Sequence, residues 1–382
     1  MRFAKLAVLS CTLPSLVSLR AQEAGTGISM PLTITGGAMY THRADAIDPS
    51  TAPMTAAFRA MLYPMFQLGS HWIASASIQV SSSPFFYFQS DETKREVRAR
   101  LIQGYVGYTI SVARGFLTVK SGQMVSAFGS FPLRYDDDVN PLIDVPMTYG
   151  SSDYGKPLQY PVTLYGQPGV ELDLNLHRFD GRVQFVNSSP ALTRVLFAGG
   201  QNANWATGAG YTIRQGFRVG ASYYRGGYLP TGVLLHPTER AGDWPGTGVG
   251  VDVQWAAGYW SVNGEWQRFF FPYPHIIADT SMKFGYVEAK RTLHPRLYLA
   301  GRIGYNANES FPRPQAPVAF FRPDRQSYEL VGGLRVNRFQ LLKIGYEWVH
   351  KERSPGTRDN VFGMQFVTSI EPLSRAFHRA VR

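Results

Sequence analysis

The stretch Val170-Glu171-Leu172-Asp173-Leu174-Asn175-Leu176-His177 decides the fold, because every even-numbered residue is apolar and every odd-numbered one is polar or charged. Successive side chains of a β-strand point to opposite faces, so this segment presents one face suited to hydrocarbon and one suited to water. The same alternation recurs in 217–224, 249–255, 260–266 and 296–303. The chain is therefore built from two-faced strands.

Segments with this pattern follow one another along nearly the whole chain, and about sixteen can be counted. They cover 31–41, 54–68, 71–81, 97–111, 115–126, 161–176, 179–187, 203–213, 216–225, 247–256, 259–269, 280–290, 295–305, 326–336, 339–350 and 359–370. The connections alternate between one or two residues and much longer loops. Short turns on one side, long loops on the other and an even strand number are typical of outer-membrane barrels.

Alternation alone also fits a soluble sandwich, so composition has to decide between the two. Aromatic residues make up 14% of the 382 residues and charged residues only 17%. Many of the aromatic residues lie near predicted strand ends, among them Tyr40, Trp72, Tyr223, Tyr224, Trp260, Phe269 to Phe271 and Trp348. Aromatic girdles at both membrane interfaces need this placement. After the first residues no apolar run reaches about 18 residues, which argues against a helical membrane protein.

The amino-terminal residues resemble a secretory signal peptide, with Arg2 and Lys5 preceding an apolar run. We expect residues 1–21 to be the signal peptide and 22–382 to form a single outer-membrane β-barrel domain. A lipoprotein signal at Cys11 is the alternative for this segment. The predicted fold is all-β, a transmembrane antiparallel up-and-down barrel in the bacterial outer membrane.

One segment carries a family resemblance. The run from Tyr105 to Gly129, with Gly122-Gln123 followed by Phe128-Gly129, is similar to the strand-strand-loop segment of phosphate-selective porin O/P-like proteins. More broadly, the chain resembles a Gram-negative porin. The resemblance implies passage of solutes and a possible homotrimer, whereas the dense basic arrays of phosphate channels are absent, so phosphate specificity is not carried over.

The third long connection, 129–160, is the longest and follows the fifth predicted strand. It contains Arg134, Asp136, Asp137, Asp138 and Asp144 among several prolines. A barrel of about sixteen strands is too wide for side chains to fill, so an inward-folded loop has to narrow it. One interpretation is a constriction whose acids face basic wall residues across the pore. A solvated outer loop and a calcium site of Asp136, Asp137, Asp138 and Asn140 remain open as alternatives.

Basic residues are the predicted lining of the pore. The set on the expected water face is Arg59, Lys120, Arg182, Arg218, Lys283, Arg296, Arg302, Arg335 and Lys343. Together with a net charge of +11 they predict a mild preference for anions. By contrast, Arg98 and Arg100 fall on the opposite parity from Gln103, which suggests that they project toward lipid phosphates.

The expected partners are outer-membrane lipid, lipopolysaccharide and small hydrophilic or anionic solutes. No nucleic-acid recognition motif accompanies the positive charge. No cofactor or metal is expected, and the histidines are scattered among different turns and loops, so an enzyme is not favoured. The leading hypothesis is a passive diffusion porin. A substrate-specific channel for phosphate or another anion, a barrel enzyme and a plugged structural barrel are the alternatives.

Overall fold

The computed structural model describes residues 27–42, 54–83, 85, 96–150, 162, 164, 166–187, 204–229, 243–273, 278–311, 324–351 and 358–370. Its strands are β1 (Gly27–Ser29), β2 (Leu32–His42), β3 (Met54–Leu62), β4 (Met65–Leu68), β5 (Trp72–Ser83), β6 (Glu96–Val112), β7 (Gly115–Met124), β8 (Gln167–Leu176), β9 (Phe179–Val186), β10 (Asn204–Arg214), β11 (Phe217–Gly227), β12 (Pro245–Ala257), β13 (Trp260–Phe271), β14 (Asp279–His294), β15 (Leu297–Phe311), β16 (Arg325–Arg335), β17 (Gln340–Lys351) and β18 (Arg358–Ile370). The expected signal peptide lies outside the described residues.

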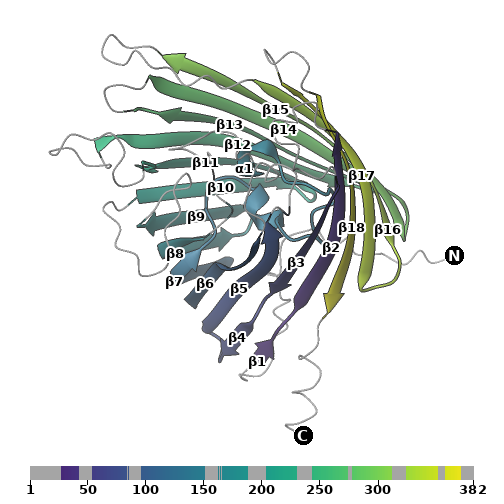
Figure 1. Ribbon diagram of the computed structural model, residues 1–382. Coiled ribbons are helices and arrows are strands. Elements are labelled where there is room, and N and C mark those ends of the chain that lie inside the picture. The colour runs from purple at the N-terminus through teal and green to yellow at the C-terminus, as the bar shows by residue number, and fades with distance from the viewer. Residues whose placement is uncertain are drawn as a thin grey trace, which may run out of the picture.

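The strands close into one antiparallel barrel. From β5 to β18 each strand pairs with the next one in sequence, and β18 pairs with β2 to complete the ring (Figure 1). At the start of the barrel β2 pairs with β3, β1 pairs with β4, and both β3 and β4 pair with β5. Pro31 separates β1 from β2 and Pro64 separates β3 from β4, because proline has no N–H to donate to the ladder. Counting each interrupted pair as one barrel strand gives 16 strands, as the sequence predicts.

The outer surface of the barrel is apolar. Val170, Leu172, Val249, Val251 and Val253 are all exposed, and they share the outward face of β8 and β12. Exposed aromatic rings cluster toward both strand ends, including Trp72, Phe179 and Trp260 near the short turns and Trp205, Phe270 and Trp348 near the long loops. An apolar band between two aromatic girdles is the surface of a barrel that spans a bilayer.

The interior holds a folded loop that follows β7. It contains the 3₁₀ helix η2 (Phe131–Arg134) and the short helix α1 (Met147–Gly150), which run inside the ring of strands (Figure 1). Buried apolar residues of the loop pack with inward-facing residues of the wall, so the barrel has its core at this contact. In the described part of the chain, no helix is long and apolar enough to cross a membrane.

Candidate functional site

The inward-folded loop, residues 125–150, is the candidate functional site, and two glycines give the chain its path into the barrel. Gly122 has φ +139° and Gly129 has φ +78°. A Cβ at Gly122 would lie 2.3 Å from the Gly104 carbonyl oxygen, and one at Gly129 would lie 2.0 Å from the Tyr149 hydroxyl. Both positions therefore require glycine, which gives a local physical reason for the Gly-Gln and Phe-Gly steps of the sequence.

Aromatic rings fix the first part of the loop against the wall. Phe128 is fully buried and packs edge-on to Tyr224, with ring centroids 5.1 Å apart, and against Phe269 at 5.5 Å. Tyr224 and Phe269 were predicted to belong to an interfacial girdle. That prediction was wrong for these two residues, because their strand parity turns them into the barrel, where they pack against the loop.

Glu265 on β13 joins the two ends of the buried loop. Its Oε1 accepts hydrogen bonds from the Ser130 N–H at 3.1 Å, the Ser130 hydroxyl at 2.7 Å and the Phe131 N–H at 2.6 Å. Its Oε2 accepts from the Tyr149 hydroxyl at 2.6 Å, and Tyr286 also donates to Oε1 at 2.7 Å. The start and the end of the loop thus meet on one buried carboxylate.

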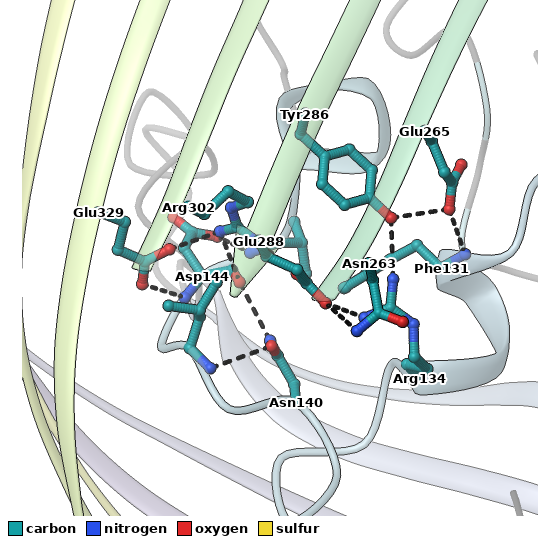
Figure 2. Close-up of polar contacts among 12 residues, drawn as sticks. Phe131, Arg134, Asn140, Asp144, Asn263, Glu265, Tyr286, Glu288, Arg302 and Glu329 are labelled. Carbon is teal, nitrogen blue, oxygen red and sulfur yellow. Dashed lines mark hydrogen bonds and ion pairs between the residues drawn. The ribbon is translucent and has the colours of Figure 1, made fainter. Parts of the chain in front are cut away.

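Two further wall glutamates hold the middle of the loop, as Figure 2 shows. Arg134 pairs with Glu288 of β14 and donates to the Tyr286 hydroxyl at 2.9 Å. Glu329 of β16 accepts from the backbone N–H of Asp144 at 3.2 Å and from Arg302 of β15 at 2.6 Å, and Arg302 also donates to the Asp144 carbonyl at 2.9 Å. The loop is therefore bound through both its side chains and its backbone.

The acidic run of the loop contacts three parts of the wall. Asp137 accepts from Thr35 at 2.6 Å and forms a buried ion pair with Arg59 of β3, whose Nε lies 2.9 Å from Asp137 Oδ2. Asp136 accepts from the Tyr63 hydroxyl, and Asp138 accepts from Ser369 at 3.1 Å. Burial, reinforced by the neighbouring Asp138, raises the pKa of the Asp136 carboxyl to about 6.

These contacts bear on the three interpretations of the loop. Most of its residues are buried inside the barrel, so an outer solvated loop is wrong for the described part, 125–150. The three aspartates turn to separate wall partners, and no group of three or more His, Cys, Asp or Glu able to hold a metal ion occurs among the described residues. The alternative of a calcium site thus has no support in this geometry.

Lys343 of β17 donates to loop carbonyls rather than pairing with an acid. Its Nζ lies 3.1 Å from the Asn140 oxygen and 3.0 Å from the Leu142 oxygen, and its side chain is fully buried. Gln365 of β18 donates to the Ile143 carbonyl at 3.1 Å. Arg59, Arg302 and Lys343, all predicted as pore-lining cations, are thus covered by the loop that they bind.

Other predicted bases keep contact with solvent. Lys120 pairs with Glu171 at 2.7 Å, and Arg218 pairs with Asp180 at 2.6 Å. Arg182 donates to the Ser126 carbonyl at 3.2 Å. Further from the loop, Arg335 ends β16 and Arg296 lies in the turn before β15, both exposed at the end of the barrel that carries the short turns.

Two predictions of side-chain direction were wrong. Lys283 lies opposite Arg268 on the outward face of β14, since its neighbours Met282 and Phe284 face inward and are buried; it pairs with Glu309 at 2.6 Å. Arg98 and Arg100 face inward, since they lie opposite the buried Ser81 and Gln79. A register shift between Ser77 and Ile78 inserts one extra residue of β6 and reverses its parity.

The glutamates that hold the loop had no predicted role. Glu265, Glu288 and Glu329 occupy buried, inward-facing positions of β13, β14 and β16. Their residue type could have indicated this role, because an acidic side chain in the middle of a barrel strand needs a hydrogen-bond donor as a partner when it is buried.

Comparison with known proteins identifies the fold. No family model and no curated protein matches the chain. Among solved structures it is similar to the outer-membrane channel DcaP of Acinetobacter baumannii, with TM-score 0.60 and 14% identity over 91% of this chain and 98% of that chain. The anion-selective porin from Comamonas acidovorans gives TM-score 0.60 and 9% identity over 91% and 100%. The trimer form of Vibrio cholerae OmpT gives TM-score 0.54 and 10% identity over 91% and 100%. At such identities the likeness establishes a shared barrel fold.

Proposed function

We propose that the protein is a porin of the bacterial outer membrane that lets small hydrophilic solutes diffuse through its barrel. The observation that supports this proposal most directly is that charged side chains on the inward face of the strands remain accessible to water. Lys120 and Asp173 face the interior of β7 and β8, and their side chains are 15% and 21% exposed. Partly exposed ion pairs inside a closed barrel fit a wetted passage beside the loop.

The outer-membrane location rests on the barrel itself. Closed β-barrels satisfy every backbone hydrogen bond in lipid, and this barrel presents an apolar surface between two aromatic girdles. Two of the similar solved structures described above, DcaP and OmpT, are also outer-membrane proteins. Outer-membrane lipid and lipopolysaccharide would therefore surround it.

The constriction role of the loop belongs to this proposal. Arg134, Asp136, Asp137, Asp138 and Asp144 would narrow the passage by holding the loop in place, because each of them bonds the wall through a side-chain or backbone atom. A transverse field between loop acids and wall bases would be weak, since Arg59 and Asp137 neutralise each other directly.

Mild anion preference is the finer part of the proposal. The net charge of +11 supports it, whereas the pairing of Lys120, Arg218 and Arg302 with acids limits its size. A homotrimer and a distant relation to phosphate-selective porins complete the proposal. The trimer form of one similar structure and the segment from Gly122 to Gly129 are their respective supports.

Planar-bilayer recording of the purified protein tests the proposal. Stepwise, ohmic conductance with a small anion-directed reversal potential in a salt gradient is the expected result. Saturable block by one solute would instead favour a substrate-specific channel. Correctly folded barrels that never conduct would refute a diffusion function.

A further inference from the structure

The loop covers only part of the inner wall. Its polar contacts reach β13 to β18, β2, β3 and β5, and Gln184 and Arg182 bond its first residues from β9. The half of β7 to β12 nearest the short turns carries a row of ionised side chains, of which Arg182 contacts the loop. We define this charge ladder as Lys120, Glu171, Asp173, Asp180, Arg182, Arg218 and Asp252. It contains three bases and four acids, Lys120 and Arg218 each lie between two acids, and several members remain partly exposed inside the barrel.

The first part of the ladder is centred on Lys120. Its Nζ lies 2.7 Å from Glu171 Oε1 and 2.9 Å from Asp173 Oδ2. Glu171 is buried, whereas Lys120 and Asp173 keep part of their surface in water. A solute that passes this wall can therefore reach a cation and an anion side by side.

The second part is centred on Arg218, and the backbone is shaped for it. The guanidinium bonds Asp180 through two nitrogens, at 2.8 and 2.6 Å, and Asp252 through the third at 2.6 Å. A Cβ at Gly210 would lie 2.0 Å from the guanidinium, and one at Gly220 would lie 2.2 Å from the Asp252 carboxylate. Two neighbouring glycines thus let Arg218 lie against the wall between two acids.

This part also faces water. The Arg218 side chain is 22% exposed and that of Asp180 is 38% exposed, whereas those of Arg59 and Asp137 under the loop are at 0% and 1%. The contrast separates charges that hold the loop from charges that a solute can contact.

We infer that the charge ladder favours small zwitterionic solutes, which carry an ammonium and a carboxylate group on one molecule. A simple anion attracted by Lys120 or Arg218 also meets adjacent acids, and a simple cation meets adjacent bases. A zwitterion can place each group beside the opposite charge without net repulsion. This inference rests on the proposed diffusion function and names the solute class for it.

Swelling of proteoliposomes with L-alanine and with glycerol, which differ little in size, tests the inference. A favourable electrostatic energy of about 1 kT raises the local concentration of a solute about threefold. The wild-type channel is therefore expected to admit L-alanine about two to three times faster than glycerol. The double variants Lys120→Met/Arg218→Gln and Asp173→Asn/Asp180→Asn should both lose this advantage. Lys283→Gln, which removes a lysine from the outer face, should keep it.

A second readout separates a charge effect from a structural one. The variant that lacks Lys120 and Arg218 should shift the reversal potential in a potassium chloride gradient toward cation selectivity. The variant that lacks the Asp173 and Asp180 carboxylates should shift it toward anion selectivity. Folding is checked for each by heat-dependent migration in gels. Entry of L-alanine no faster than glycerol in an open wild-type channel would overturn the inference alone. Absence of both swelling and conductance would overturn the proposed function as well.

Discussion

Glu265→Gln is predicted to loosen the loop while leaving the barrel folded. The wild-type carboxylate accepts four hydrogen bonds from the loop, donated by the Ser130 N–H and hydroxyl, the Phe131 N–H and the Tyr149 hydroxyl. A glutamine has nearly the same shape, but it carries no charge and only one accepting oxygen. Either the Ser130–Phe131 group or Tyr149 therefore loses its acceptor.

The size of the effect follows from the difference between charged and neutral hydrogen bonds. Bonds to a charged group contribute about 1.5–3 kcal/mol and neutral ones about 0.5–1.5 kcal/mol, and the variant also escapes the cost of burying a charge. Allowing for that offset, loop detachment should become easier by about 2–4 kcal/mol. This corresponds to a roughly 30- to 1,000-fold larger detached population.

Amide hydrogen exchange measures that population directly, because the Ser130 and Phe131 N–H groups exchange only when they leave Glu265. Their exchange should accelerate by this factor, whereas amides of the β12–β13 ladder keep their protection. Glu309→Gln is the matched control, since Glu309 is an exposed acid on the outer face. Unchanged exchange at Ser130 and Phe131 in a folded Glu265→Gln barrel would refute the anchoring role.

Three further predictions concern the ion pair, the pH dependence and the lipid face. Arg59→Met should lower the free energy of unfolding, measured by urea titration, by about 3–5 kcal/mol, because it leaves the Asp137 carboxylate buried without its cation. The double variant Arg59→Met/Asp137→Asn should recover part of this loss. An equal loss in the single and the double variant would contradict the pairing. The pKa of Asp136 is about 6 in the fold and near 3.8 when exposed, so the folded state holds its proton more tightly. The stabilising contribution of this proton is complete below about pH 4 and falls by roughly 2–3 kcal/mol as the pH rises to about 6, so Asp136→Asn should reduce the loss of unfolding free energy across this range by that amount. Val251→Lys on the outward face should cost about 2–4 kcal/mol in lipid vesicles, and the inward Ser222→Lys should cost less; the reverse order would contradict the assigned faces.

Strand number, closure and most faces could be predicted because a period of two is a local property of the sequence. The prediction for Val170 to Leu176 holds residue by residue, since β8 has no bulge. On β6 the same reasoning fails at Arg98 and Arg100, because one inserted residue inverts the parity and nothing in the local composition marks it. The odd or even position of a residue therefore predicts its face only within a stretch of strand that contains no β-bulge.

The inner wall shows a second limit of predicting side-chain direction from the sequence. Sequence reasoning assigns apolar residues to lipid and charged ones to water, yet Phe269, Phe284 and Tyr286 face inward because the loop needs an apolar surface there. On β14 this reverses the expected direction of Lys283. An apolar side chain cannot indicate by itself whether its partner is lipid or a loop more than a hundred residues away in the chain.

The same long-range contacts explain why the sequence predicted the type of contact between loop and wall but not how closely the residues lie. The loop's position after the fifth strand and its acids pointed to electrostatic contacts with basic wall residues. Two opposite charges on facing surfaces can act across a water-filled gap or close it, and burial decides which. Arg59 and Asp137 are both nearly inaccessible to water, so their attraction holds the loop to the wall. The charges left to act on a solute are then those that the loop does not cover, and selectivity should follow the mixed ladder of β7 to β12 more than the acids of the loop.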